Sequence, residues 1–143
     1  MNDMSRRPVE LLSLLHAAAT AQAAVEAELN AIGLSFAKLV ALKTLSEAGE
    51  SLPLGQLAER LSCVKSNITQ LVDRLEADGF VIREPDPHDR RTRLAVLTGA
   101  GRKACKEGTR VRREAERRLL GKLTKEESRQ LAALLGKLRP PRE

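Results

Sequence analysis

The order of hydrophobic patterns between residues 54 and 97 constrains the fold more than any other feature of this chain. Apolar residues recur at helical spacing over 54–61 and again over 65–78, with only three residues between the two stretches. The next apolar runs, 80–83 and 94–97, are short and β-prone, and turn-forming residues lie between them. We therefore predict two short helices joined by a tight turn, followed by a β-hairpin with a long, basic tip.

Helical patterns also extend on both sides of this unit. Residues 9–31 and 34–48 predict two helices before it, and residues 98–123 predict a long helix after it. Thr124 and Glu127 then form a capping-box signature, which predicts the start of a last helix. The expected fold class is therefore mainly α with a small β-hairpin wing.

Composition excludes several classes of protein. The chain has 143 residues, 25 Lys and Arg against 19 Asp and Glu, and a net charge of +6. Phe36 and Phe80 are the only aromatic residues, too few for stacking on single-stranded nucleic acid. The two His and two Cys show no metal-ligand spacing, and no nucleophile–base pair or phosphate-binding Gly loop is present. We expect no metal, no cofactor and no enzymatic activity.

The N-terminal segment has a second interpretation. Arg6 and Arg7 precede an uncharged stretch from Leu11 to Val25, which superficially resembles a secretory signal. Glu10 lies where the apolar region would begin, and polar residues interrupt the stretch, which is also too polar for a membrane helix. We therefore expect a cytoplasmic protein with no membrane partner.

The helix predicted over 65–78 separates apolar from polar residues. Ile68, Leu71, Val72 and Leu75 share one face, so the polar side chains face outward. Side chains of this kind hydrogen-bond to base edges in the major groove, and Asn or Gln can pair bidentately with adenine. The alternative is a polar helix face that only contacts solvent. The candidate DNA-binding residues on this helix are Lys65, Ser66, Asn67, Thr69, Gln70 and Arg74.

The run from Asp89 to Arg93 favours the DNA-binding interpretation. It places Arg90, Arg91 and Arg93 in a hairpin directly after the candidate recognition helix. Such a wing can insert arginine into the narrow minor groove, where the negative potential is strongest. We expect Asp89 to pair with Arg91 and hold it extended.

These motifs together resemble the MarR family of winged-helix transcriptional regulators. The resemblance rests on Leu57–Leu61, on Lys65–Leu75 and, most specifically, on Asp86–Thr98. It implies a homodimer that binds a pseudo-palindromic duplex, usually as a repressor. It also implies that the helix over 65–78 enters the major groove and that Arg91 enters the minor groove. Many members respond to a small-molecule effector in a pocket between the dimer helices and the winged lobe.

Three positions depart from the family pattern. The family often has Gly at Ser62, a polar helix cap at Val64 and Arg at Gln70. Without a polar residue at Val64 we expect the recognition helix to lack a side-chain N-cap, at a cost of about 1 kcal/mol. Gln70 indicates an operator that differs from those of Arg-bearing relatives.

The division of the chain follows from its apolar helices. One domain spans 1–143, with a winged helix-turn-helix lobe over 34–98 and a helical dimerisation region over 5–33 and 99–143. Leucines in the first and last helices have too little of the lobe to pack against, so pairing with a second copy is the natural way to bury them.

The charges are unevenly distributed. Residues 51–97 contain seven basic and seven acidic side chains, so the expected DNA-binding lobe is neutral. Residues 98–123 contain nine basic and three acidic side chains. Their net charge of +6 equals the net charge of the whole chain. The first cations of this segment, Arg102, Lys103 and Lys106, are candidates for contacts to the DNA backbone. We interpret Arg110, Arg112, Arg113, Arg117 and Arg118 as a solvated face.

The sequence gives the least information about which residues would detect a ligand or an oxidant. Cys63, in the predicted turn, is interpreted as a buried structural thiol. Cys105 lies beside Lys103 and Lys106, which would lower its pKa, so a redox-active thiol is one hypothesis. His16 either lines a ligand pocket or lies at the dimer seam, and the residues favour neither. A winged-helix architectural or interaction module without operator specificity is the alternative function.

Overall fold

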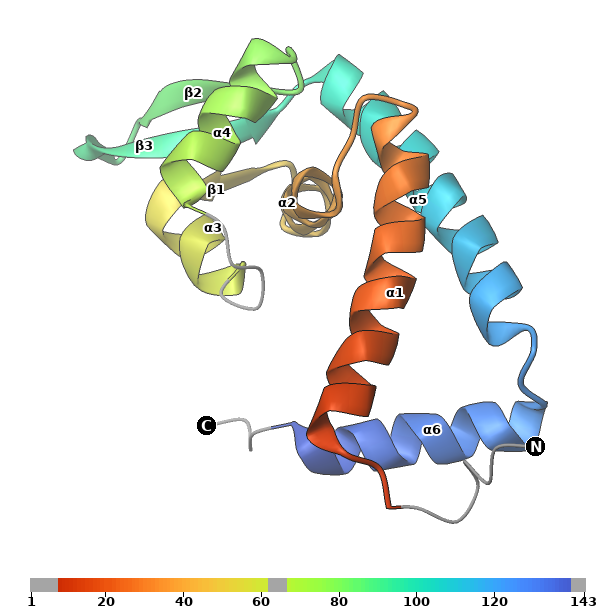
Figure 1. Cartoon of the computed structure of the whole chain (residues 1–143). Coiled ribbons are helices and arrows are strands. Elements are labelled where there is room, and N and C mark those ends of the chain that lie inside the picture. Colours follow the sequence, from red (N-terminus) through yellow and green to blue (C-terminus); the bar gives the residue numbers. More distant parts are fainter. Residues whose placement is uncertain (1–7, 62–66, 140–143) are drawn as a thin grey trace.

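The structure, a computed structural model, describes residues 8–61 and 67–139 (Figure 1). The predicted helices and the two hairpin strands follow one another in the predicted order, and residues 51–53 form a further strand that the sequence analysis did not predict. The elements are α1 (Leu11–Asn30), α2 (Phe36–Glu47), β1 (Ser51–Pro53), α3 (Leu54–Arg60), α4 (Ile68–Ala77), β2 (Val81–Asp86), β3 (Asp89–Leu97), α5 (Gly99–Leu120) and α6 (Lys125–Leu138). The fold is mainly helical with a small antiparallel sheet, as predicted.

The sheet organises the winged lobe. Its strand order is β1-β3-β2, and both pairings are antiparallel, with Leu52 opposite Ala95 and Ile82 opposite Val96. Helices α2, α3 and α4 pack against this sheet and one another around a core of fully buried side chains. The largest of these side chains in the lobe are Leu39, Leu42, Leu45, Leu57, Val72, Leu75 and Val81.

The remaining helices lie to one side of the lobe. Helix α5 packs against both α1 and α2, so it connects the lobe to the helical region. Figure 1 shows the hairpin pointing away from α1 and α5, and α6 crossing their far end. None of the residues of α6 is buried within the single chain. The capping box predicted at its start is present, because Thr124 Oγ1 accepts the Glu127 N–H and Glu127 Oε1 accepts the Thr124 N–H.

Two features of the lobe differ from the sequence-based predictions. Helix α4 begins at Ile68, and Asn67 caps it by accepting the Thr69 N–H at 3.0 Å. The predicted absence of a side-chain N-cap was therefore wrong, because the cap lies three residues after Val64. The hairpin strands are also longer than predicted, since they meet at a turn of only Pro87 and His88. The arginines of the wing therefore lie on β3 and not in a long loop.

Close packing at Gly101 joins α5 to the base of the wing. A Cβ atom there would overlap the Phe80 carbonyl oxygen and lie 2.8 Å from Leu97 Cδ1. Thr98 caps α5 by accepting the Gly101 N–H, and its hydroxyl donates to the Gly79 carbonyl at 2.6 Å. The orientation of the lobe on α5 is therefore fixed by direct backbone contact.

Candidate nucleic-acid interface

Helix α4 presents a polar face because its apolar residues are used in the core. Leu71, Val72 and Leu75 are buried, whereas Thr69, Gln70 and Arg74 are exposed. Asn67 is also exposed, but its amide oxygen is engaged in the helix cap. Asn67 is therefore partly used by the helix cap, whereas the cap does not involve the side chains of Thr69, Gln70 and Arg74. The predicted contact residues Lys65 and Ser66 lie outside the described residues.

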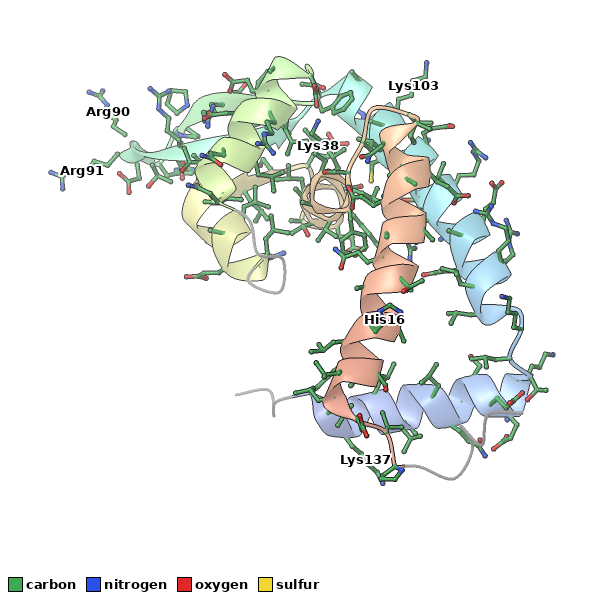
Figure 2. The ribbon with its side chains drawn as sticks, viewed as in Figure 1. His16, Lys38, Arg90, Arg91, Lys103 and Lys137 are labelled. Atoms are coloured by element: carbon green, nitrogen blue, oxygen red, sulfur yellow. The ribbon has the colours of Figure 1, made fainter. Side chains whose placement is uncertain are left out.

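The wing carries exposed arginines. Arg90, Arg91 and Arg93 are exposed on β3, and Figure 2 shows Arg90 and Arg91 at the far end of the hairpin, projecting away from the rest of the chain. Asp89 does hold this segment, although through different atoms than expected. Its carboxylate accepts the Arg91 backbone N–H and the Thr92 hydroxyl, both at 3.0 Å. The contact from Asp89 to Arg91 is therefore made to the backbone and not to the guanidinium.

The acidic side chains of α4 form ion pairs within the lobe. Arg83 on β2 donates to Asp73 Oδ1 at 2.6 Å and to Glu76 Oε2 at 3.2 Å. The hydrogen bond that Arg83 donates to Asp73 is the main reason that the pKa of Arg83 is raised above its ordinary value. Lys38 on α2 pairs with Asp78, the C-cap residue of α4, at 2.7 Å.

These ion pairs explain how a lobe with no net charge can still expose unpaired cations. Within the described residues, Arg83 is the only cation of residues 51–97 that forms an ion pair. The exposed cations on α4 and the wing form no such pair, while three of the carboxylates are in ion pairs, two of them sharing the single charge of Arg83. Phosphate affinity depends on where the cations point and not on the net charge of the lobe. Among the described residues of 51–97, the cations without an ion pair are Arg60, Arg74, Arg90, Arg91 and Arg93.

Arg83 and Lys38 are the residues that the sequence analysis missed. The available signal was the pair Asp73 and Glu76, which are three residues apart and share one face of a helix. A strand that begins four residues after the helix ends can place a cation opposite that face. Lys38 lies forty residues from Asp78, so local spacing gave no indication of this pair.

The basic segment on α5 divides into paired and unpaired cations. Arg110 pairs with Glu107 and Glu114, and Arg112 pairs with Glu116. Arg118 pairs with Glu28 on α1, and Arg102 pairs with Glu50 at 2.9 Å. Arg110, Arg113, Arg117 and Arg118 are exposed, as the interpretation of the distal arginines as a solvated face expects, whereas the Arg112 side chain is only 25% exposed.

The two candidate sensor residues occupy different environments. Cys105 is buried, and burial is the main reason that the pKa of its thiol is raised. The predicted lowering by Lys103 and Lys106 was wrong: a hydrogen bond with Thr109 and the charge of Lys43 oppose the shift without reversing it. His16 is exposed on α1, in the half of the helix that is distant from the lobe (Figure 2). Cys63 lies outside the described residues.

Cavities occur where the lobe meets the helical region. One of about 450 Å³ lies between α1, α2 and α5, where Val25, Phe36 and Val40 supply much of the apolar wall. An adjoining cavity of about 300 Å³ is lined mainly by apolar side chains of α1 and α5. His16 is not among the residues that line either of them. Their volumes are those of small-molecule sites.

The described residues lack the features of a metal centre and of a membrane-spanning helix. No group of three or more His, Cys, Asp or Glu residues within 8–61 and 67–139 is arranged to hold a metal ion. In the same ranges, none of the helices combines the length and the apolar character that crossing a bilayer requires.

The fold and the exposed face of α4 define a winged helix-turn-helix protein of the transcription-regulator class. The family model described as MarR family matches residues 34–92. The uncharacterised transcriptional regulator YcgE of Bacillus subtilis is 35% identical over 112 residues, which cover 78% of this chain and 72% of YcgE. The chain belongs to the MarR family of transcriptional regulators.

Solved structures agree with this assignment. A probable transcriptional regulator from Pseudomonas aeruginosa is 31% identical, with a TM-score of 0.80 over 91% of this chain and 97% of its own. A mutant MarR from Escherichia coli, complexed with operator DNA, has the same fold, with a TM-score of 0.79 at 24% identity, over 97% of this chain and 100% of its own.

Proposed function

We propose that this chain binds operator DNA sequence-specifically as a homodimer and represses transcription. The observation that carries the proposal is the placement of unpaired cations and hydrogen-bonding side chains on α4 and on the adjacent wing. The compensation of Asp73 and Glu76 by Arg83 supports it, because it removes negative charge from the helix that would approach phosphates.

Each lobe would contact both grooves. The exposed side of α4 carries Thr69, Gln70 and Arg74, which have the donors and acceptors that read base edges in the major groove. The hairpin extends Arg91 beyond the lobe, at a position suited to the neighbouring minor groove. Arg90 and Arg93 are then available for phosphates.

Dimerisation is supported by apolar side chains that the single chain leaves exposed. They lie on α1 and α6 and at the end of α5, and they would be costly to leave in water. A two-fold axis through this surface would place two copies of α4 about 34 Å apart, which is one turn of B-form DNA. The exposed large apolar residues of this surface are Val9, just before α1, and Leu11, Leu12, Leu15, Leu120, Leu131, Leu134, Leu135 and Leu138. Ile82 on β2 is also exposed but lies outside this surface.

Release by a small-molecule effector is supported by the cavities at the junction of α1, α2 and α5. Because α5 is fixed to the base of the wing at Gly101, a ligand that shifts α5 relative to α2 would change the spacing of the two recognition helices. Such a ligand would favour the unbound form of the dimer only through its differential affinity for the two spacings.

The test is a comparison of DNA affinities. We expect the purified protein to bind a palindromic fragment from the region upstream of its own gene at least about 10³-fold more tightly than random duplex. A ratio near one would contradict operator specificity and would favour the alternative, an architectural winged-helix module. A reporter placed behind the bound fragment should be silenced when the protein is produced, and activation would contradict the repressor role.

A further inference from the structure

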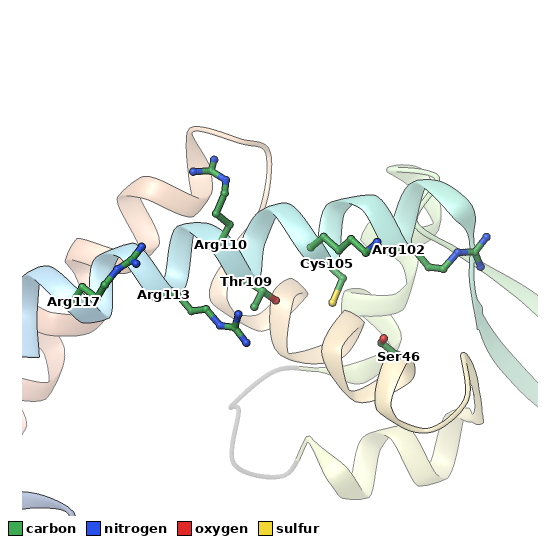
Figure 3. Close-up of a pocket in the computed structure, with 8 residues that line it drawn as sticks. Ser46, Arg102, Cys105, Thr109, Arg110, Arg113 and Arg117 are labelled. Atoms are coloured by element: carbon green, nitrogen blue, oxygen red, sulfur yellow. The ribbon is translucent and has the colours of Figure 1, made fainter. Parts of the chain in front are cut away.

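A second kind of cavity lies along the flank of α5 and differs from the apolar ones in its chemistry. It has a volume of about 500 Å³ and is lined by one side of α5 together with Ser46 near the end of α2. In Figure 3, Cys105, Thr109 and Arg113 project from α5 toward the side where Ser46 lies. None of the described residues that line it is acidic. The lining residues are Ser46, Arg102, Cys105, Lys106, Thr109, Arg110, Arg113 and Arg117.

The cations of α5 fall into two groups, those that pair with a carboxylate and those that do not. Those with carboxylate partners include Arg112 and Arg118, whose partners Glu116 and Glu28 lie outside this cavity. Lys106, Arg113 and Arg117 all line the cavity, and none of the three forms an ion pair with another described residue. Of the four cations of α5 that form no ion pair with a described residue, three therefore line one cavity, and Lys103 does not. Arg102 and Arg110, which are paired with carboxylates, line the same cavity.

Helical spacing makes this arrangement unfavourable in the absence of an anion. Arg113 and Arg117 are four residues apart, as are Lys106 and Arg110, so like charges lie next to each other on the helix surface. Like-charge pairs at this spacing destabilise a helix about as much as opposite-charge pairs stabilise it. Arg110 is compensated by Glu107 and Glu114, whereas Arg113 and Arg117 have no such compensation.

We propose that this cavity binds a small anion with two or more acidic groups, such as a dicarboxylate or a phosphorylated metabolite. The guanidinium groups of Arg113 and Arg117 would take its acidic oxygens in charge-assisted hydrogen bonds. Lys106 adds a third cation, and the hydroxyls of Thr109 and Ser46 supply neutral donors. The volume suits a compact ligand of this class.

The position of the cavity gives the anion a regulatory role, which rests on the proposed DNA-binding function. Ser46 belongs to the winged lobe and the cations belong to α5, so a ligand that contacts both would restrain the lobe relative to the dimer helices. Arg113 and Arg117 belong to the second half of α5, which extends away from α4 and the hairpin in Figure 1. Anion binding and DNA binding can therefore be measured separately.

The experiment measures anion binding to the full chain without DNA, by calorimetry at constant ionic strength. The probes are inorganic pyrophosphate and succinate, with chloride as the reference anion. The test variant is Arg113→Gln with Arg117→Gln. The matched control is Lys103→Gln with Lys122→Gln, which removes the same charge from exposed positions of the same basic segment that do not line the cavity.

We expect at least one probe to bind the wild-type chain with a dissociation constant of about 1 mM or tighter. The test variant should lose at least about tenfold in affinity for that probe, since charge-assisted hydrogen bonds are removed, and the control should change by less than about twofold. Binding of only one probe would identify its acidic group as the preferred one. Absence of binding by both probes, or an equal loss in test variant and control, would overturn the proposal.

A second readout does not depend on the identity of the ligand. At low salt and without anion, the test variant should have a melting temperature equal to or about 1–2 °C above that of the wild type, because a like-charge pair is removed. The added probe should raise the melting temperature of the wild type but not that of the test variant. A test variant that retains operator affinity while losing the anion response would establish the site independently of DNA binding. An anion response that persists in the test variant would refute it.

Discussion

The guanidinium of Arg83, on β2, donates a hydrogen bond to the carboxylate of Asp73, on α4, at 2.6 Å. A second bond from the same guanidinium reaches Glu76 at 3.2 Å. The recognition helix and the strand that leads into the wing are therefore joined by one side chain. Because the two elements would enter different grooves, the angle between them matters for DNA binding more than for folding.

We predict that Arg83→Gln weakens operator binding much more than it lowers the free energy of unfolding. Asp73 is 59% exposed, so solvent screens the pair, and the loss in stability should be below about 1 kcal/mol. Operator affinity should fall at least about tenfold, since two carboxylates on α4 would then face the DNA without compensation. Fluorescence anisotropy and urea denaturation measure the two effects.

Lys43→Gln is the matched control for this prediction. It removes the exposed pair with Glu47 on α2, at 3.8 Å, which is distant from the wing. Its operator affinity should stay within about twofold of the wild type. If Arg83→Gln and Lys43→Gln reduce affinity equally, Arg83 has no special role in positioning the recognition helix.

Substitution of the proposed major-groove contact and of the proposed minor-groove contact should have different effects on DNA binding. Gln70→Ala should relax base preference at one position of each half-site, since a bidentate contact contributes about 1–3 kcal/mol of discrimination. Arg91→Ala should weaken binding to all sequences, with little change in base preference and a shallower dependence on salt. A panel of single-base operator variants, titrated at several salt concentrations, separates the two outcomes. Unchanged affinity in both variants would show that these residues do not contact DNA.

The sequence predicted the order of the elements because each one carries its own periodicity. The apolar residues of α4 lie on one face, so Leu71, Val72 and Leu75 indicated both the helix and its exposed side. The start of the helix was harder to predict, because Asn67 can serve either as a cap or as a base-contacting side chain. The contacts of Arg83 and Lys38 depend on tertiary packing, which no local pattern encodes.

Substitution at Gly101 should uncouple the lobe from α5. Gly101→Ala places a methyl group against the Phe80 carbonyl oxygen, which belongs to the backbone and cannot turn aside. We predict a loss of about 1–3 kcal/mol in the free energy of unfolding. Gly99→Ala is the control, since its Cβ would lie 3.4 Å from the flexible end of Arg102. Equal stability of the two variants would mean that the junction accommodates the added methyl group.

The buried environment of Cys105 predicts that its thiol reacts slowly. Burial raises its pKa, so the thiolate fraction at pH 7–8 is lower than that of a free cysteine, and the thiolate is the reactive species. In a Cys63→Ser background, we expect Cys105 to react with a thiol reagent at least about tenfold more slowly in the folded than in the unfolded chain. Its rate should continue to rise as the pH increases beyond the usual pKa of cysteine. Fast reaction at neutral pH would restore the hypothesis of a redox sensor.

The apolar surface of α6 should determine the oligomeric state. Leu134 is 58% exposed and Leu138 is 65% exposed, and they lie four residues apart on one face of the helix. If this face pairs with a second copy, Leu134→Glu with Leu138→Glu would bury two carboxylates without partners and would shift the protein from dimer to monomer. Helix content should be retained, because neither side chain belongs to the core of the single chain. Light scattering should give a mass near 15.7 kDa for the variant and twice that for the wild type.

Operator binding should weaken in parallel, since one half-site contact remains in place of two. An unchanged dimer would require another surface to form the interface, and a wild-type monomer with full operator affinity would exclude the two-fold arrangement.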